Sequence, residues 1–87
     1  MTNKSKWIET ELERGDEIHL VPIRSRLEGR KDKLRTVVQR LVSGRWVTAH
    51  KSDWVHSPKA GQIPEAKLNE AAEQIADVLV DQVEAQL

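Results

Sequence analysis

The strongest constraint on the fold is the spacing of apolar residues toward the end of the chain. They follow one another at steps of three or four positions: Leu68, Ala72, Ile75, Leu79, Val83 and Leu87. Because an α-helix has about 3.6 residues per turn, this spacing places them all on one side. Pro64 suits the first turn, where its missing N–H is not needed. We therefore predict an amphipathic helix over residues 64–87, packed on one face of the remaining structure.

The other side of the predicted helix is acidic. Its carboxylates are Glu70, Glu73, Asp77, Asp81 and Glu84. No Lys or Arg follows any of them four positions later, so their mutual repulsion is not relieved within the helix. A solvated surface is the plain interpretation. Contact with a basic partner is the alternative.

The middle of the chain has the patterns of β-strands. Residues 17–27 form one candidate strand, whose apolar phase changes near Pro22; since Pro has no N–H to donate, we expect an edge strand with a bulge there. Residues 33–42 and 45–51 form two more, and the polar segment 28–32 connects the first two. Residues 17–51 thus predict a basic, three-stranded antiparallel sheet.

The register of the second hairpin decides which residues face the core. A three-residue loop over 42–44 places Leu41 opposite Arg45, whereas a two-residue turn mixes apolar and basic residues on both faces. We favour the three-residue loop. It gives a core face of Val37, Leu41, Val47 and Ala49 and an exposed face of Thr36, Val38, Arg40, Trp46, Thr48 and His50.

Two flanking segments complete the expected domain. In residues 5–14, Trp7, Ile8 and Leu12 fit a short helix ended by Gly15. The alternation of Ile8, Thr10 and Leu12 also fits a strand, but we favour the helix. Residues 52–63, which contain Ser57-Pro58, form a connector. The expected fold class is a single α+β domain over residues 1–87, in the order α-β-β-β-α.

Composition limits the other properties of the chain. It has no Cys, Phe or Tyr, so it can form neither a disulfide nor a zinc–thiolate site, and its core is thin. A thin core makes a homodimer a reasonable alternative to a monomer. The first residues do not have the pattern of a signal peptide, and no apolar run reaches the roughly 18 residues of a membrane span. We expect a cytoplasmic protein with no membrane partner.

Charge is separated along the chain, although the whole sequence is formally neutral. Residues 24–51 carry about +7 and residues 65–87 about −5. The basic residues that flank the 28–32 connection are Arg24, Arg26, Arg30, Lys31, Lys33 and Arg35. Such a cluster suits nucleic-acid phosphates, an acidic protein surface or plain solvation.

An aromatic residue accompanies this basic cluster. In the favoured register Arg40 lies opposite Trp46, with His50 farther along the same face, so this face could stack a base or anchor a protein. Burial of Trp46 beneath a helix is the alternative.

Chemistry beyond binding has little support in the sequence. The serines lack the pattern of a nucleophile elbow, and no pair of carboxylates marks a cleft. His50, Asp53 and His56 include metal-ligand types, but their spacing fits no established motif. We expect a protein that is not an enzyme, with no metal, cofactor or small-molecule substrate.

The expected element order resembles that of the double-stranded RNA-binding domain. In that family the loop between the first two strands reaches a minor groove, and residues 28–32 occupy the same place here. Glu70-Ala71-Ala72-Glu73 is similar to its Ala-rich final helix. That family opens its final helix with lysines that hold phosphates, whereas this helix opens with Pro64-Glu65-Ala66-Lys67.

The sequence thus predicts a binding protein, with nucleic acid held by the basic hairpin as the leading hypothesis. The alternative is a small protein–protein interaction module, such as an inhibitor, an adaptor or an assembly factor of a phage or plasmid. Its two oppositely charged faces could also join in a homodimer.

Overall fold

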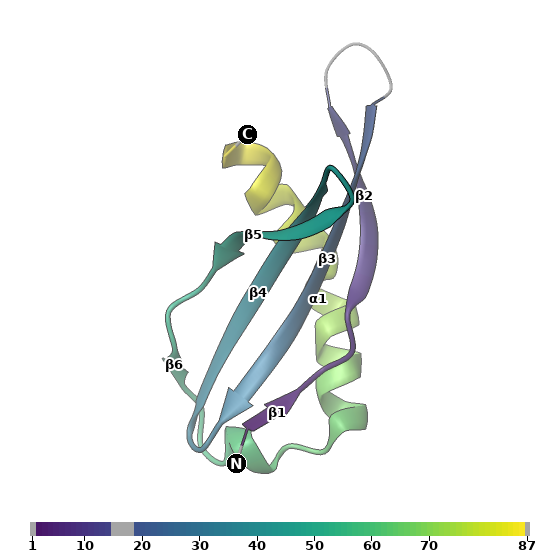
Figure 1. Ribbon diagram of the computed structural model, residues 1–87. Helices are drawn as coiled ribbons and strands as arrows, with labels where there is room; N and C mark the ends of the chain where they lie inside the picture. Colours follow the sequence, from purple (N-terminus) through teal and green to yellow (C-terminus); the bar gives the residue numbers. More distant parts are fainter. Residues whose placement is uncertain (1, 15–18, 87) are drawn as a thin grey trace.

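The computed structural model, which describes residues 2–14 and 19–86, is an antiparallel sheet with one long helix across one face (Figure 1). The elements are β1 (Thr2–Lys4), β2 (Ile8–Arg14), β3 (His19–Arg30), β4 (Lys33–Val42), β5 (Arg45–Lys51), β6 (Val55–His56), the 3₁₀ turn η1 (Ala60–Gln62) and α1 (Glu65–Gln86). The predicted α+β class, with its C-terminal helix, is confirmed. Within these described residues the sheet has six strands rather than three, and the element order is not that of the double-stranded RNA-binding domain. Gly15 and Leu87 lie outside the described residues.

Two long strands, β3 and β4, form the centre of the sheet. Strands β1 and β2 both pair with β3, and strands β5 and β6 both pair with β4. The molecule is elongated, with extents of 44 × 22 × 21 Å. Because β3 has partners on both sides, the prediction that it is an edge strand is wrong. Pro22 is tolerated because it pairs with Glu11 of β2, while the ladder to β4 starts only at Ile23.

The predicted N-terminal helix is wrong, because Ile8–Arg14 is a strand. Ile8 pairs with Ser25 and Thr10 with Ile23, so the alternation of this segment matches that of β3. A short segment that fits both periods is decided by its pairing partner, and β3 is 12 residues long.

The β4–β5 hairpin has a two-residue turn, so the favoured three-residue loop is also wrong. Ser43 and Gly44 have φ values of 50° and 79°, and Leu41 pairs with Trp46 rather than Arg45. Positive φ at both turn residues gives the twist that joins two strands most directly. A bulge then leaves Ala49 unpaired, since Thr48 pairs with Gln39 and His50 with Val38.

The predicted faces of β4 are also wrong, because α1 packs on the face that carries Val38 rather than on the face that carries Val37. Val38 is fully buried beneath α1, with Ile23, Leu79 and Val83. Val37 is also buried, but it pairs with Arg26 on the opposite face of the sheet.

The amphipathic helix is confirmed. Its buried residues are Leu68, Ala72, Ala76, Leu79 and Val83. Leu68 and Ala72 pack against Leu27, toward the end of β3, and the later residues pack against Ile23 and Val38. The carbonyl oxygen of Pro64 accepts the N–H groups of Lys67 and Leu68, at 3.0 and 3.1 Å, and so starts the helix. No helix of residues 2–14 and 19–86 is long and apolar enough to cross a membrane.

The predicted connector, residues 52–63, is an ordered strap that contains β6 and η1. Ser52 N–H donates to the Thr36 carbonyl at one end, and Gly61 N–H donates to the Lys31 carbonyl at the other. Turn η1 packs directly on the β3 backbone, because a Cβ on Gly29 would lie 2.6 Å from the carbonyl oxygen of Ala60. The strap is therefore held at both ends, and it carries Trp54 over the sheet.

Candidate functional site

The face of the sheet opposite α1, called the open face below, collects most of the basic residues of β3. Side chains alternate along a strand, so the residues next to buried Ile23, Ser25 and Leu27 point away from the helix. On β3 these are Arg24, Arg26, Glu28 and Arg30, and their partners on β4 are Gln39, Val37, Arg35 and Lys33. Strand β1 adds Lys4, which pairs with Glu28.

Arginine and tryptophan side chains stack on the open face and form a ladder. The guanidinium carbon of Arg24 lies 4.2 Å from the ring centre of Trp7 and 4.4 Å from that of Trp46. The guanidinium carbon of Arg26 lies 4.1 Å from the ring centre of Trp7, so Trp7 contacts both arginines. These distances are those of cation–π pairs. The ladder, defined as Trp46, Arg24, Trp7, Arg26, Glu28, Arg35 and Trp54, uses all three Trp of the chain.

The far end of the ladder is Trp54, whose ring centre lies 4.4 Å from the guanidinium carbon of Arg35. The three indoles are half-buried although α1, the helix of the described residues, packs on the other face of the sheet. The ladder thus forms a thin second layer on the face of the sheet that α1 leaves bare.

A buried carboxylate joins the two halves of the ladder. Glu28 is only 4% exposed. Its Oε2 accepts from Nε and Nη2 of Arg26, at 3.1 and 2.8 Å. Its Oε1 accepts from Nε of Arg35 at 2.7 Å and lies 2.6 Å from Nη2 of the same residue. Burial raises the pKa of Glu28, but the hydrogen bonds and charges of Arg35 and Arg26 outweigh it and lower the pKa below its ordinary value of 4.5.

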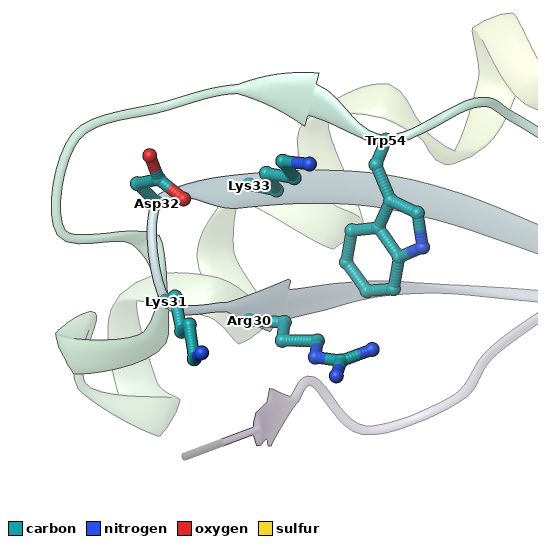
Figure 2. Close-up of a pocket in the computed structure, with 5 residues that line it drawn as sticks. All are labelled: Arg30, Lys31, Asp32, Lys33 and Trp54. Atoms are coloured by element: carbon teal, nitrogen blue, oxygen red, sulfur yellow. The ribbon is translucent and has the colours of Figure 1, made fainter.

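Two shallow depressions adjoin at the basic end of the open face. The first, of about 330 Å³, is lined by Arg30, Lys31, Asp32, Lys33 and Trp54. Figure 2 shows the Trp54 indole lying over β3 and β4, with the three cations around the β3–β4 turn. The second, of about 340 Å³, is lined by Thr2, Lys4, Arg26, Glu28, Arg30, Arg35, Val37, Gln39, Thr48, Lys51 and Trp54. Arg30 and Trp54 line both, so Trp54 is a shared wall.

An acidic depression lies at the opposite end of the ladder. This depression, of about 510 Å³, is lined by Glu9, Thr10, Glu11, Pro22, Leu41 and Trp46. Among the described residues its lining has two carboxylates and no cation. The two depressions beside Trp54 are thus lined mainly by cations, whereas the depression at Trp46 is lined by Glu9 and Glu11, with Arg24 stacked on the Trp46 ring.

The β3–β4 turn presents its charges in a fixed conformation. Lys31 has a φ of 52°, in the left-handed region that non-glycine residues seldom adopt. The strap holds this turn, since Ser57 N–H donates to the Asp32 carbonyl at 2.6 Å and Gly61 N–H to the Lys31 carbonyl at 2.8 Å. Lys31 is exposed, as are Arg30 and Lys33.

The structure brings most of the predicted basic residues together. Arg24, Arg26, Arg30, Lys33 and Arg35 share the open face, and Lys31 lies at its turn. Arg40 and His50 do not belong to this group, because they pair with buried Ile23 and Val38 on the α1 side. The predicted pairing of Arg40 with Trp46 is wrong, because Arg40 pairs with Val47 and Trp46 stacks with Arg24 instead.

The predicted acidic surface lies on the outer side of α1. Glu70, Glu73, Asp77 and Asp81 are exposed. Glu73 forms an ion pair of 2.7 Å with Lys6, in which both side chains are half exposed. The side chain of Glu84 lies outside the described residues.

The two histidines of the 50–56 segment, His50 and His56, are on different strands. His50 is on β5, whereas His56 on β6 lies 3.4 Å from Asp32. Within the described part of the chain, no group of three or more His, Asp or Glu residues is arranged to hold a metal ion.

Sequence reasoning missed the roles of Trp7, Trp54 and Glu28. One signal was present in the sequence: Arg24, Arg26, Glu28 and Arg30 alternate with apolar or small residues, which places them on one face of a strand. Trp54 gave no such signal, because its position depends on how the strap crosses the sheet.

No family model matches the chain, and comparisons with the curated proteins and with the solved structures find no match. The site must therefore be interpreted from its own geometry.

Proposed function

We propose that the open face binds nucleic acid at its basic end, with phosphates at the two depressions beside Trp54. One observation carries this proposal: seven cations and two carboxylates line those depressions, and an indole stands between them. The cations are Lys4, Arg26, Arg30, Lys31, Lys33, Arg35 and Lys51. Each phosphate that they neutralise would release counterions and favour binding.

The position of Trp54 favours a single strand over a duplex. A single strand offers unstacked bases to an aromatic side chain, whereas the bases of a duplex are already stacked on one another. Insertion of the hairpin into a major groove is less favoured, because the β3–β4 turn is hydrogen-bonded to the strap and does not project freely. We therefore infer a surface that takes a strand laid across it.

Charge reversal at the turn tests this proposal. We expect Lys31→Glu to weaken the binding of a labelled single-stranded oligonucleotide by about tenfold or more, and to lower the slope of log affinity against log salt by about 0.7 for each lost phosphate contact. Fluorescence anisotropy at several salt concentrations measures both quantities.

Arg45→Glu is the matched control, because Arg45 is exposed at the other hairpin and lines neither depression. We expect this variant to retain most of the affinity. Equal losses in the two variants, or no binding by the wild-type protein at low salt, would refute the proposed site.

A protein partner is the second candidate. It is favoured by the acidic depression at Trp46, which a phosphate backbone would avoid and which a basic side chain would fit. If the chain retained one stoichiometric protein from a lysate after nuclease treatment, this candidate would replace nucleic acid.

A homodimer is a further alternative, in which the open face of one copy meets the acidic side of α1 of the other. It predicts sedimentation that depends on salt, and a monomer at low salt would exclude it.

A further inference from the structure

A buried anion at the floor of a basic depression needs an explanation. In the 340 Å³ depression Glu28 lies among Lys4, Arg26, Arg30, Arg35 and Lys51. Its carboxylate weakens the positive potential there. A face that bound anions by charge alone would be stronger without it.

The geometry of Glu28 suggests that it orders its neighbours. It bonds Nε and Nη2 of Arg26 through one oxygen and contacts the same two nitrogens of Arg35 through the other. The remaining nitrogen of each guanidinium group, Nη1, makes no hydrogen bond with Glu28. Each group is also stacked on an indole, Arg26 on Trp7 and Arg35 on Trp54. Two long side chains that would repel each other are thus held in fixed places.

We propose that the depression around Glu28 is a subsite for one phosphate group, and that Glu28 is the positioning residue that holds Arg26 and Arg35 ready for it. Three further cations of this depression, Lys4, Arg30 and Lys51, are exposed and could approach the phosphate. The statement that this phosphate belongs to a nucleic-acid strand rests on the proposed function. The subsite itself does not, because free pyrophosphate offers the same chemistry.

Preorganisation gives the physical reason for this arrangement. Ordering a long side chain on binding costs affinity, and a side chain that is already ordered avoids this cost. The side chains of Arg26 and Arg35 are only 21% and 24% exposed, so most of their freedom is lost before any ligand arrives. Glu28 thus reduces the net charge of the depression but fixes two of its donors.

The decisive experiment compares two substitutions that each remove one negative charge and asks whether each weakens or strengthens the binding of an oligonucleotide. Glu28→Gln and Glu11→Gln each make the open face more positive by one unit. We expect Glu28→Gln to weaken the binding of a single-stranded oligonucleotide by roughly tenfold, because two side chains must now be ordered on binding. We expect Glu11→Gln, which removes an exposed carboxylate opposite Pro22, to strengthen binding slightly. If both variants bound more tightly, Glu28 would be only a counter-charge and the proposal would be overturned.

A variant that conserves charge keeps the test valid if Glu28→Gln fails to fold. Lys at position 35 retains the charge but loses the planar group that stacks on Trp54 and contacts Glu28 through two nitrogens. We expect Arg35→Lys to weaken binding by about fivefold or more, and Arg45→Lys, the control, to have no effect. Equal affinities for wild-type protein and Arg35→Lys would contradict the proposal.

Calorimetry with pyrophosphate separates the two proposals. Pyrophosphate binding that is weakened in Arg35→Lys, without oligonucleotide binding by the wild-type protein, would support the subsite and refute the nucleic-acid function. Oligonucleotide binding that responds to Lys31→Glu but not to Arg35→Lys would support the function and refute the subsite.

Discussion

At the scale of single residues, the protein places polar groups where their partners are available. Glu28 is buried between two guanidinium groups, and both of its oxygens are occupied. A buried carboxylate is tolerated when it is paired and hydrogen-bonded in this way. Two buried serines of the described residues differ in this respect. Ser5 follows the rule because its hydroxyl is hydrogen-bonded, whereas Ser25 is an exception because its hydroxyl has no partner there.

Replacing each buried serine by Ala should have opposite effects. Ser5 Oγ accepts the N–H of Leu27 at 2.9 Å and donates to the Lys6 carbonyl, so Ser5→Ala should destabilise the protein by about 1–2 kcal/mol. Ser25 Oγ has no hydrogen-bond partner in the described part of the chain, so Ser25→Ala should stabilise it by about 1 kcal/mol. Urea unfolding measures both changes, and a loss of stability in Ser25→Ala would contradict this account.

The stability of the ladder should depend on pH through Glu28. Because the pKa of Glu28 is lower in the folded protein than in the unfolded chain, its carboxylate stabilises the fold above the unfolded-state value and ceases to do so as pH falls through the folded-state value. We expect Glu28→Gln to cost about 3 kcal/mol at pH 7, since one partner of a buried ion pair is removed.

This difference should shrink as the pH is lowered below the ordinary carboxyl pKa of 4.5. Urea unfolding of both proteins at pH 7, 4 and 3 measures it. A difference that stayed constant across this range would show that the charge of Glu28 does not stabilise the fold.

At the scale of the elements, the periodicity of the sequence was sufficient to predict an element where that element is long and regular. Helix α1 was predicted because its apolar spacing persists over 22 residues. Strand β2 was not, because a segment of seven residues fits two periods and only its pairing with β3 decides between them. The register of β5 depended on the positive φ values of Ser43 and Gly44, which the sequence indicates only weakly.

The β3–β4 turn should show a trade between stability and binding. Lys31 adopts a left-handed conformation that costs a non-glycine residue about 1 kcal/mol, whereas Asn tolerates it. We expect Lys31→Asn to stabilise the fold by about 0.5–1 kcal/mol and to weaken nucleic-acid binding by removing a cation. Urea unfolding and anisotropy measure the two effects. If Lys31→Asn stabilised the fold without loss of affinity, Lys31 would not belong to the nucleic-acid site.

At the scale of the whole molecule, the charge separation read along the sequence becomes a separation between faces. Basic residues gather on the open face, and Glu70, Glu73, Asp77 and Asp81 lie on the outer side of α1. A neutral chain can therefore orient toward a polyanion with one face. The sequence indicated this polarity and most of the cations, but the depressions depend on the strap and on Trp54. These positions arise from long-range hydrogen bonds, which no local pattern in the sequence reports.

Binding of nucleic acid at the basic end of the open face is tested most directly by titrating the labelled protein with a short single-stranded oligonucleotide. The titration is followed by the NMR signals of the three Trp indole N–H groups and of the backbone amides. We expect shifts at Trp54 and at the β3–β4 turn, around Arg30 to Lys33, and little change at Trp46 or along α1. Shifts centred on α1 or on the acidic depression at Trp46, or no shifts at low salt, would show that the basic end of the open face is not a nucleic-acid site.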